Sequence, residues 1–280
     1  MKRYKTIIGS VLLVAFLMLA GACGLVSSYD YAAYPNIHLE EAVHLTEDAA
    51  SPYCDFSLDY AYLDEEGDSI AALINRTIQH EFLGEVYASL TPSVAVDSFK
   101  NDYLRDYRQE TEPLFKTDVA QNGNTGEWPA WYNQTYSMVS LVEDGYNGIV
   151  NVSSNVYCDM GGAHPNQWGR WLNFDGSTGK LLTLQDVFPA DAKTSIERML
   201  LDKLIEHQAT QYPDETIASL DDLHNKGILQ LTEMYIPDNF LLAKDEMLFL
   251  FNRYDIAPYS AGEIVLRFGY EEIGPYLKLN

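Results

Sequence analysis

Residues 135–174 read TYSMVSLVEDGYNGIVNVSSNVYCDMGGAHPNQWGRWLNF, and their pattern is the clearest indication of the fold. Apolar and polar residues alternate along 135–142, 148–159 and 167–174, which is the period of a strand with one buried face. Turn-forming residues such as glycine, aspartate and asparagine separate the three runs. Strands that follow one another through short connections pair antiparallel, so this stretch predicts a β-meander.

The segments on either side of the meander carry both helical and extended patterns. On the N-terminal side we expect a strand, a helix that Asp68 opens and a second helix after Pro92. On the C-terminal side we expect a helix, a hairpin that turns at Lys244-Asp245 and a last strand. The ranges are 53–63 and 264–270 for the two strands, 192–207 for the later helix and 240–251 for the hairpin. This grouping predicts an α+β fold of antiparallel β-meander sheets packed with a few helices.

The N-terminus has the pattern of an export signal. A basic leader is followed by an uncharged apolar run, Ile7–Ala20, which is shorter than the ~20 residues that span a bilayer. Small residues then precede Cys23, and this junction resembles a lipobox, although the lipobox pattern prefers leucine where Ala20 stands. We therefore expect residues 1–22 to be a lipoprotein signal peptide and Cys23 to carry the lipid. Simple cleavage and an uncleaved anchor are the alternatives.

An exported, lipid-anchored chain of this kind has its folded part outside the cytoplasmic membrane. Residues 23–50 show weak periodicity and predict a tether with one short extended segment. Removal of the leader, which holds three of the 18 Lys and Arg and none of the 41 Asp and Glu, takes the formal net charge from −23 to −26. This charge excludes nucleic acid as a partner and attracts basic proteins. The alternative is that the acidity only keeps an exported protein soluble.

Two cysteines remain after the predicted cleavage, Cys54 and Cys158. Each lies on the apolar face of a predicted strand, so the sequence allows either a disulfide between them or two buried thiols. Neither has a basic neighbour in sequence that would lower its pKa, and we therefore do not expect a catalytic cysteine.

The loop at Gly161-Gly162-Ala163-His164 is the natural place to look for chemistry. Paired glycines allow a positive φ after the strand, and His164 could ligate a metal, act as a base or tie the loop down by hydrogen bonds. The six histidines show no metal-ligand spacing, and no nucleophile or phosphate-binding motif occurs. We therefore predict no catalytic residue, no metal and no cofactor.

The four tryptophans form two pairs spaced by three residues, Trp128 with Trp131 and Trp168 with Trp171. Aromatic faces can stack on sugars or anchor a protein partner, and Trp168 is a candidate for that role. Core packing is the alternative. Trp168 and Trp171 have opposite parity in their strand, so we expect at least one of them to enter the core.

Three stretches in order resemble a known family. They read YCDMGGAH at 157–164, NFD followed by TGKLLTLQDVF within 173–188, and YDIAPYSAG at 254–262. They are similar to the extracellular module shared by the anti-sigma factor RsiV and the peptidoglycan deacetylase PdaC. The resemblance implies two intimately associated subdomains, a PdaC-like one at 51–178 and a RsiV-like one at 179–280.

RsiV-like members bind lysozyme outside the cell, whereas PdaC-like members join the module to a separate catalytic domain. This chain shows neither a sigma-binding segment nor a deacetylase motif, so we expect a module that stands alone. The resemblance implies that loop residues near His164 and Tyr259 contact the partner.

The interpretation that combines these observations is a non-catalytic envelope lipoprotein that binds lysozyme or another envelope protein. One alternative is a peptidoglycan-modifying enzyme with a site at His164 and neighbouring acids, and another is a purely structural envelope protein. A convergent pocket of acids and His164 would favour the enzyme. An exposed surface of aromatic and acidic loop residues would favour the binding module.

Overall fold

The computed structural model describes residues 34–123, 126–230 and 233–278. From Tyr34 onward the chain forms one compact unit. The predicted signal peptide and Cys23 lie outside the described residues. Within the described part of the chain, no helix is both long enough and apolar enough to cross a membrane.

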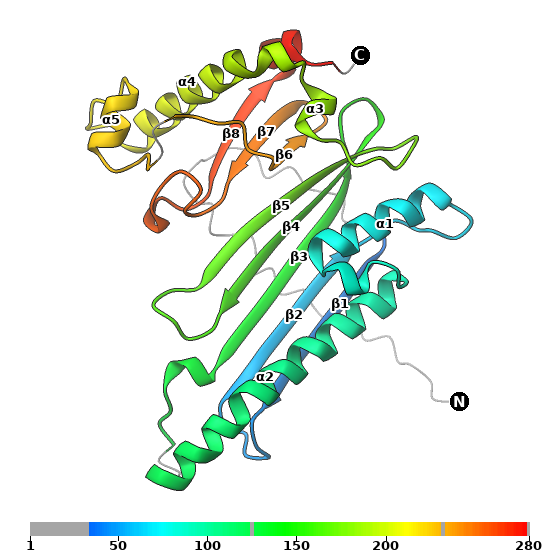
Figure 1. The fold of residues 1–280 in the computed structure, drawn as a ribbon, viewed down its shortest axis with the longest axis vertical. Helices are drawn as coiled ribbons and strands as arrows, with labels where there is room; N and C mark the ends of the chain where they lie inside the picture. Colours follow the sequence, from blue (N-terminus) through cyan, green and yellow to red (C-terminus); the bar gives the residue numbers. More distant parts are fainter. Residues whose placement is uncertain (1–33, 124–125, 231–232, 279–280) are drawn as a thin grey trace. The chain divides into compact units, whose positions relative to one another are not determined.

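The meander predicted at 135–174 forms one side of a five-stranded sheet (Figure 1). The strands stand in the order β1-β2-β3-β4-β5, and β3, β4 and β5 pair antiparallel as predicted. Part of the predicted tether belongs to the sheet as β1, which pairs antiparallel with β2. The bounds are β1 Asn36–His44, β2 Tyr53–Ala61, β3 Gln134–Asp144, β4 Ile149–Asp159 and β5 Asn166–Asp175.

One pairing in this sheet departs from the predicted meander, because β2 and β3 run parallel. A parallel pair needs a long crossover connection, and here α1 (Ser69–Phe82) and α2 (Pro92–Asn122) form it. The Asp68 carboxylate accepts hydrogen bonds from the first amides of α1, as its predicted capping role requires. Figure 1 shows both helices on the same face of the sheet.

Residues 184–278 add a smaller second layer in which a three-stranded antiparallel sheet packs against α4 (Lys193–Gln211). Phe249, Leu266 and Phe268 of this sheet share a core with Ile196 and Leu200 of α4. The bounds are α3 Leu184–Val187, α4 Lys193–Gln211, α5 Leu220–Asn225, β6 Phe240–Leu242, β7 Glu246–Phe251, β8 Ile264–Gly269 and α6 Tyr270–Ile273. The α+β fold class is therefore confirmed.

Each sheet has its own hydrophobic core. One lies between α1, α2 and the five-stranded sheet, and the other lies between α4 and the three-stranded sheet. The subdomain boundary placed between residues 178 and 179 stays a prediction.

Cys54 and Cys158 are free thiols, and β3 stands between the strands that carry them. Cys54 is fully buried on the helix-covered face of β2. Burial, with smaller contributions from Asp55 and Cys158, raises the pKa of Cys54 to about 12. A thiol with such a pKa is protonated at neutral pH, so Cys54 acts as a small hydrophobe in the core.

Asparagine side chains connect the two sheets along the outer edge of β5. Asn239 accepts a hydrogen bond from the Trp171 amide and donates to the Gly169 carbonyl, both within 2.8 Å. Asn252 accepts from the Gly169 amide at 2.7 Å and donates to the same carbonyl. These two amides replace the strand that would otherwise pair with this edge. They also bring the segments around β6 and β7 next to the start of β5.

Candidate functional site

The connection between β4 and β5 is fixed by its first glycine. Gly161 has φ +68°, and its amide donates a 2.8 Å hydrogen bond to the Asp159 carboxylate. A Cβ at this position would come within 2.3 Å of the backbone of Ala130 and Trp131. The chain can therefore pass the 130–132 turn only with glycine here, and the positive φ predicted for this loop is confirmed at Gly161.

His164 lies at the surface beside Tyr259, far along the sequence but adjacent in the fold. The two rings stack with centroids 3.8 Å apart and an interplanar angle of 20°. The Tyr259 hydroxyl donates to the Pro165 carbonyl at 2.9 Å, which ties the 254–262 segment to the β4–β5 connection. The structure thus brings together two of the residues that the sequence singled out.

Tyr254 completes this group, and sequence reasoning did not identify it. Its hydroxyl lies 2.9 Å from His164 Nε2, and the side chain is 54% exposed. Its φ is +71°, a left-handed conformation that is uncommon for a non-glycine residue. The only sequence signal is its position at the start of the YDIAPYSAG stretch. We call Tyr254, Tyr259 and His164 the tyrosine–histidine surface.

Arg253 packs against Tyr259. Its guanidinium carbon lies 4.5 Å from the centre of the Tyr259 ring, and Nη1 donates to the Tyr259 carbonyl at 2.9 Å. Burial raises the pKa of the nearby Glu263, while the Arg253 charge and a hydrogen bond with Asn155 oppose that rise. Arg253 Nε and Glu263 Oε1 are buried and find no hydrogen-bond partner among the described residues.

Trp168 lines a hollow of about 410 Å³. It is 40% exposed, and Trp171 is half-buried. The prediction that at least one of the two enters the core is therefore wrong. The physical reason is that β5 is an edge strand of the sheet, where the side chains of Asn239 and Asn252 bond to its outer backbone groups. The residues around the hollow are Glu81, Trp168, Gly169, Arg170, Tyr235, Pro237, Asp238, Asn239, Asn252 and Asp255.

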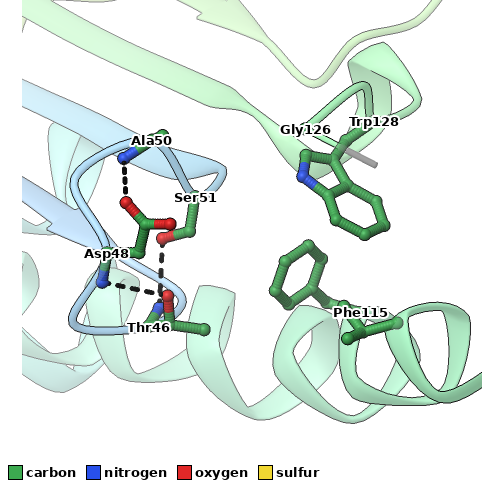
Figure 2. A pocket seen from close by; sticks show the side chains of 8 residues that line it. Thr46, Asp48, Ala50, Ser51, Phe115, Gly126 and Trp128 are labelled. Carbon is green, nitrogen blue, oxygen red and sulfur yellow. Dashed lines mark hydrogen bonds between the residues drawn. The ribbon is translucent and has the colours of Figure 1, made fainter. Parts of the chain in front are cut away.

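A second hollow of about 300 Å³ opens between α2 and the turn that joins β1 to β2 (Figure 2). Trp128 contacts Phe115 edge-on in its aromatic wall, with ring centroids 4.6 Å apart. The opposite wall is a turn whose polar groups bond to one another. Asp48 accepts from the Ala50 amide, and Ser51 accepts from the Thr46 amide. These bonds explain the shape of the turn without a ligand.

The His164 side chain is held in place by contacts with the rings of Tyr254 and Tyr259. The contacts of its ring are the two tyrosines and the Pro165 carbonyl, and no carboxylate is among them within the described residues. Across the ranges that the structure describes, no group of three or more His, Cys, Asp or Glu side chains is arranged to hold a metal ion. The convergent acid and histidine arrangement that would favour an enzyme is not formed at this loop.

Part of the chain matches a protein family of unknown function. Residues 185–271 match the model of a family described as "Protein of unknown function (DUF3298)". This range contains Tyr254 and Tyr259 but not His164. A comparison with curated proteins gives no match.

Two solved structures extend the likeness to most of the chain. A member of the DUF3298 family from Bacteroides fragilis is 26% identical, with a TM-score of 0.76, and the match covers 88% of this chain and 94% of that one. A DUF3298 family protein from Pseudomonas aeruginosa PAO1 is 14% identical, with a TM-score of 0.53 and coverage of 89% and 96%. The second likeness concerns the fold alone. The narrower resemblance to RsiV-like and PdaC-like modules stays a prediction.

Proposed function

We propose that this chain is an extracytoplasmic, lipid-anchored binding module that captures a basic cell-envelope protein of the lysozyme type and catalyses no reaction. The observation that carries the proposal is the tyrosine–histidine surface. An exposed tyrosine is held there in a strained backbone conformation by a hydrogen bond to a histidine that is itself stacked on a second tyrosine. Strain of this kind is retained where the surroundings over-determine it, and functional surfaces are its usual location.

Preorganisation is what this arrangement offers a protein partner. Tyrosines supply large contact area with a polar tip, and they are enriched among the residues that dominate binding energy. Side chains already fixed before contact lose less conformational entropy on binding. Tyr157 and Met160 lie at the end of β4, where the β4–β5 connection begins, and both are exposed. They add apolar surface to this part of the molecule.

The charge of the chain supports a cationic partner. The full sequence has a formal net charge of −23, and a charge of this size steers oppositely charged proteins during approach. Lysozymes of the c type are basic, which makes them the natural first partner to test.

The binding proposal is tested by surface plasmon resonance with c-type lysozyme over the immobilised protein. Tyr254→Ala should weaken binding by about tenfold or more, because it removes a preorganised anchor. Tyr212→Ala is the matched control, since Tyr212 is also an exposed tyrosine but stands at the end of α4. Absence of binding at high micromolar lysozyme, or equal affinity of the two variants, would contradict the proposal. Turnover of a muropeptide that is lost in His164→Ala would favour an enzyme.

Anchoring is tested separately. Lipidation at Cys23 predicts that Cys23→Ala releases the protein from the membrane fraction or stalls its processing. Cell fractionation and gel migration of the two forms give the answer. If the variant fractionates and migrates as the parent does, the lipid anchor is wrong.

A further inference from the structure

We infer that the hollow beside Trp168, here called the Trp168 pocket, is a binding site for a guanidinium or ammonium group presented by a basic protein. Four parts of the chain line the pocket. Trp168 and Arg170 come from β5, Glu81 comes from the last turn of α1, and Asp238 and Asp255 come from the segments before β6 and after β7. Its volume of about 410 Å³ lies within the range of about 300–1,000 Å³ that is usual for ligand sites.

Most polar groups of the pocket are already engaged. The amides of Asn239 and Asn252 bond to the edge of β5. Arg170 donates from Nε and Nη2 to one oxygen of Glu81, at 3.2 Å and 2.8 Å. This pair therefore forms a neutral wall.

Two carboxylates are left for a ligand. Asp255 uses one oxygen to accept the Asn252 amide at 2.7 Å, and its second oxygen makes no hydrogen bond among the described residues. Within the same ranges Asp238 makes no hydrogen bond or ion pair, and it is exposed. Both charges act on one ring, because burial first and then Asp255 and Asp238 raise the pKa of Tyr235. Tyr235, Asp238 and Asp255 all line the pocket.

The charged groups of the pocket determine the sign of the charge that a ligand must carry. Three carboxylates face one guanidinium, so the pocket has a net formal charge of −2, and the chain around it is also strongly acidic. An anion would be repelled. The exposed indole of Trp168 adds an aromatic face, and tryptophan is the best of the side chains for holding a cation by its π-system. A cation meets both a charge partner and an aromatic face.

The occupant is an arginine or lysine side chain of the protein partner. The inference rests on the proposed function only for the identity of that partner, because the pocket chemistry selects the cation by itself. An uncharged sugar, which could also stack on Trp168, is an outcome of the test below.

The experiment uses the full chain purified in detergent, with ¹⁵N-labelled tryptophan and the Trp168 indole signal assigned by Trp168→Phe. N-acetyl-arginine amide is the probe, and N-acetyl-citrulline amide is its neutral isostere. The Trp168 signal should move progressively with the arginine probe and stay in place with citrulline. Asp238→Asn with Asp255→Asn should weaken the response about tenfold. Asp97→Asn with Glu110→Gln makes the same charge change at exposed positions of α2 and should leave it within about twofold.

Three results would overturn the inference. They are no response to the arginine probe, an equal response to citrulline, and equal losses in the two double variants, which would reduce the effect to overall charge. The test needs no lysozyme. A chain that answers the arginine probe but does not bind lysozyme would retain the pocket and lose the proposed partner. If the chain binds lysozyme but its Trp168 signal does not respond to the arginine probe, the proposed partner is retained and the pocket assignment is wrong.

Discussion

Tyr254 shows what a single residue contributes to this surface and what it costs. A left-handed backbone costs a non-glycine residue about 1–2 kcal/mol, whereas glycine adopts it freely. Tyr254→Gly should therefore be more stable than Tyr254→Ala by about 1 kcal/mol, since both lose the same ring and only the alanine keeps the strain. Urea unfolding of the two variants measures the difference.

Tyr212 is the control position for that comparison. It is also an exposed tyrosine, but its φ is −124°. There the order should reverse, because glycine loses more conformational entropy on folding and gains nothing from strain relief. The same order at both positions would contradict a strained Tyr254.

Glu143 gives a pH dependence at the same scale. Burial raises the pKa of this carboxyl above its ordinary value of 4.5. The folded chain therefore binds the proton more tightly than the unfolded chain, and stability falls as pH rises through the raised value. Glu143→Gln removes this loss. It should be more stable than the parent at pH 7, and the difference should disappear below about pH 4.

Chemical denaturation at several pH values measures this difference. Glu110→Gln, an exposed change on α2, should stay within about 0.5 kcal/mol of the parent at pH 7. A Glu143→Gln variant that is no more stable at pH 7, or whose advantage persists at pH 3, would show that the carboxyl is not held in a desolvated site.

The residues of the candidate site were partly predictable from sequence. His164 and Tyr259 carried a signal, because glycines, a proline and the family-like stretches mark both loops. Their stacking depends on tertiary contacts, which no local pattern encodes. Tyr254 was missed because only the folded loop gives it a positive φ. At least one of Trp168 and Trp171 was expected to enter the core. The edge position of β5 explains why neither does.

At the scale of elements, the alternating runs predicted strands well because one buried face and one open face demand a period of two. The antiparallel strands β3, β4 and β5 follow from those runs, and capping and proline signals located the starts of α1 and α2. The parallel pairing of β2 with β3 did not follow, since the sequence does not show where two intervening helices return the chain. β1 was read as part of a tether because its burial is incomplete along its length.

The outer edge of β5 yields an element-scale prediction. Asn239 and Asn252 satisfy backbone groups of Gly169 and Trp171 that no strand pairs with. Replacing both asparagines by alanine should cost about 2–4 kcal/mol, because each change leaves buried or half-buried backbone groups without a partner. It should also increase aggregation at the freed edge. Urea unfolding and light scattering measure the two effects.

Asn166 provides the matched control for that edge. It is an exposed asparagine at the start of the same strand, and Asn166→Ala should change stability by less than about 0.5 kcal/mol. An Asn239→Ala, Asn252→Ala double variant as stable as Asn166→Ala would show that the amides do not hold the edge.

At the scale of the whole molecule, acidity and surface chemistry lead to the same class of partner. The formal net charge of −23 acts at long range, whereas the tyrosine–histidine surface acts only on contact. Long-range attraction mainly sets the rate of association, and buried contacts mainly set the rate of dissociation. The two contributions can therefore be separated by salt.

The most direct measurement is the association rate of c-type lysozyme with the immobilised protein between about 10 and 150 mM salt. The Debye length shrinks from ~30 to ~8 Å over that range. If the net charge steers lysozyme, the association rate falls steeply while the dissociation rate changes little. Tight binding with a salt-independent association rate would contradict the electrostatic part of the account, and no binding at any salt concentration would contradict the binding of a basic envelope protein of the lysozyme type.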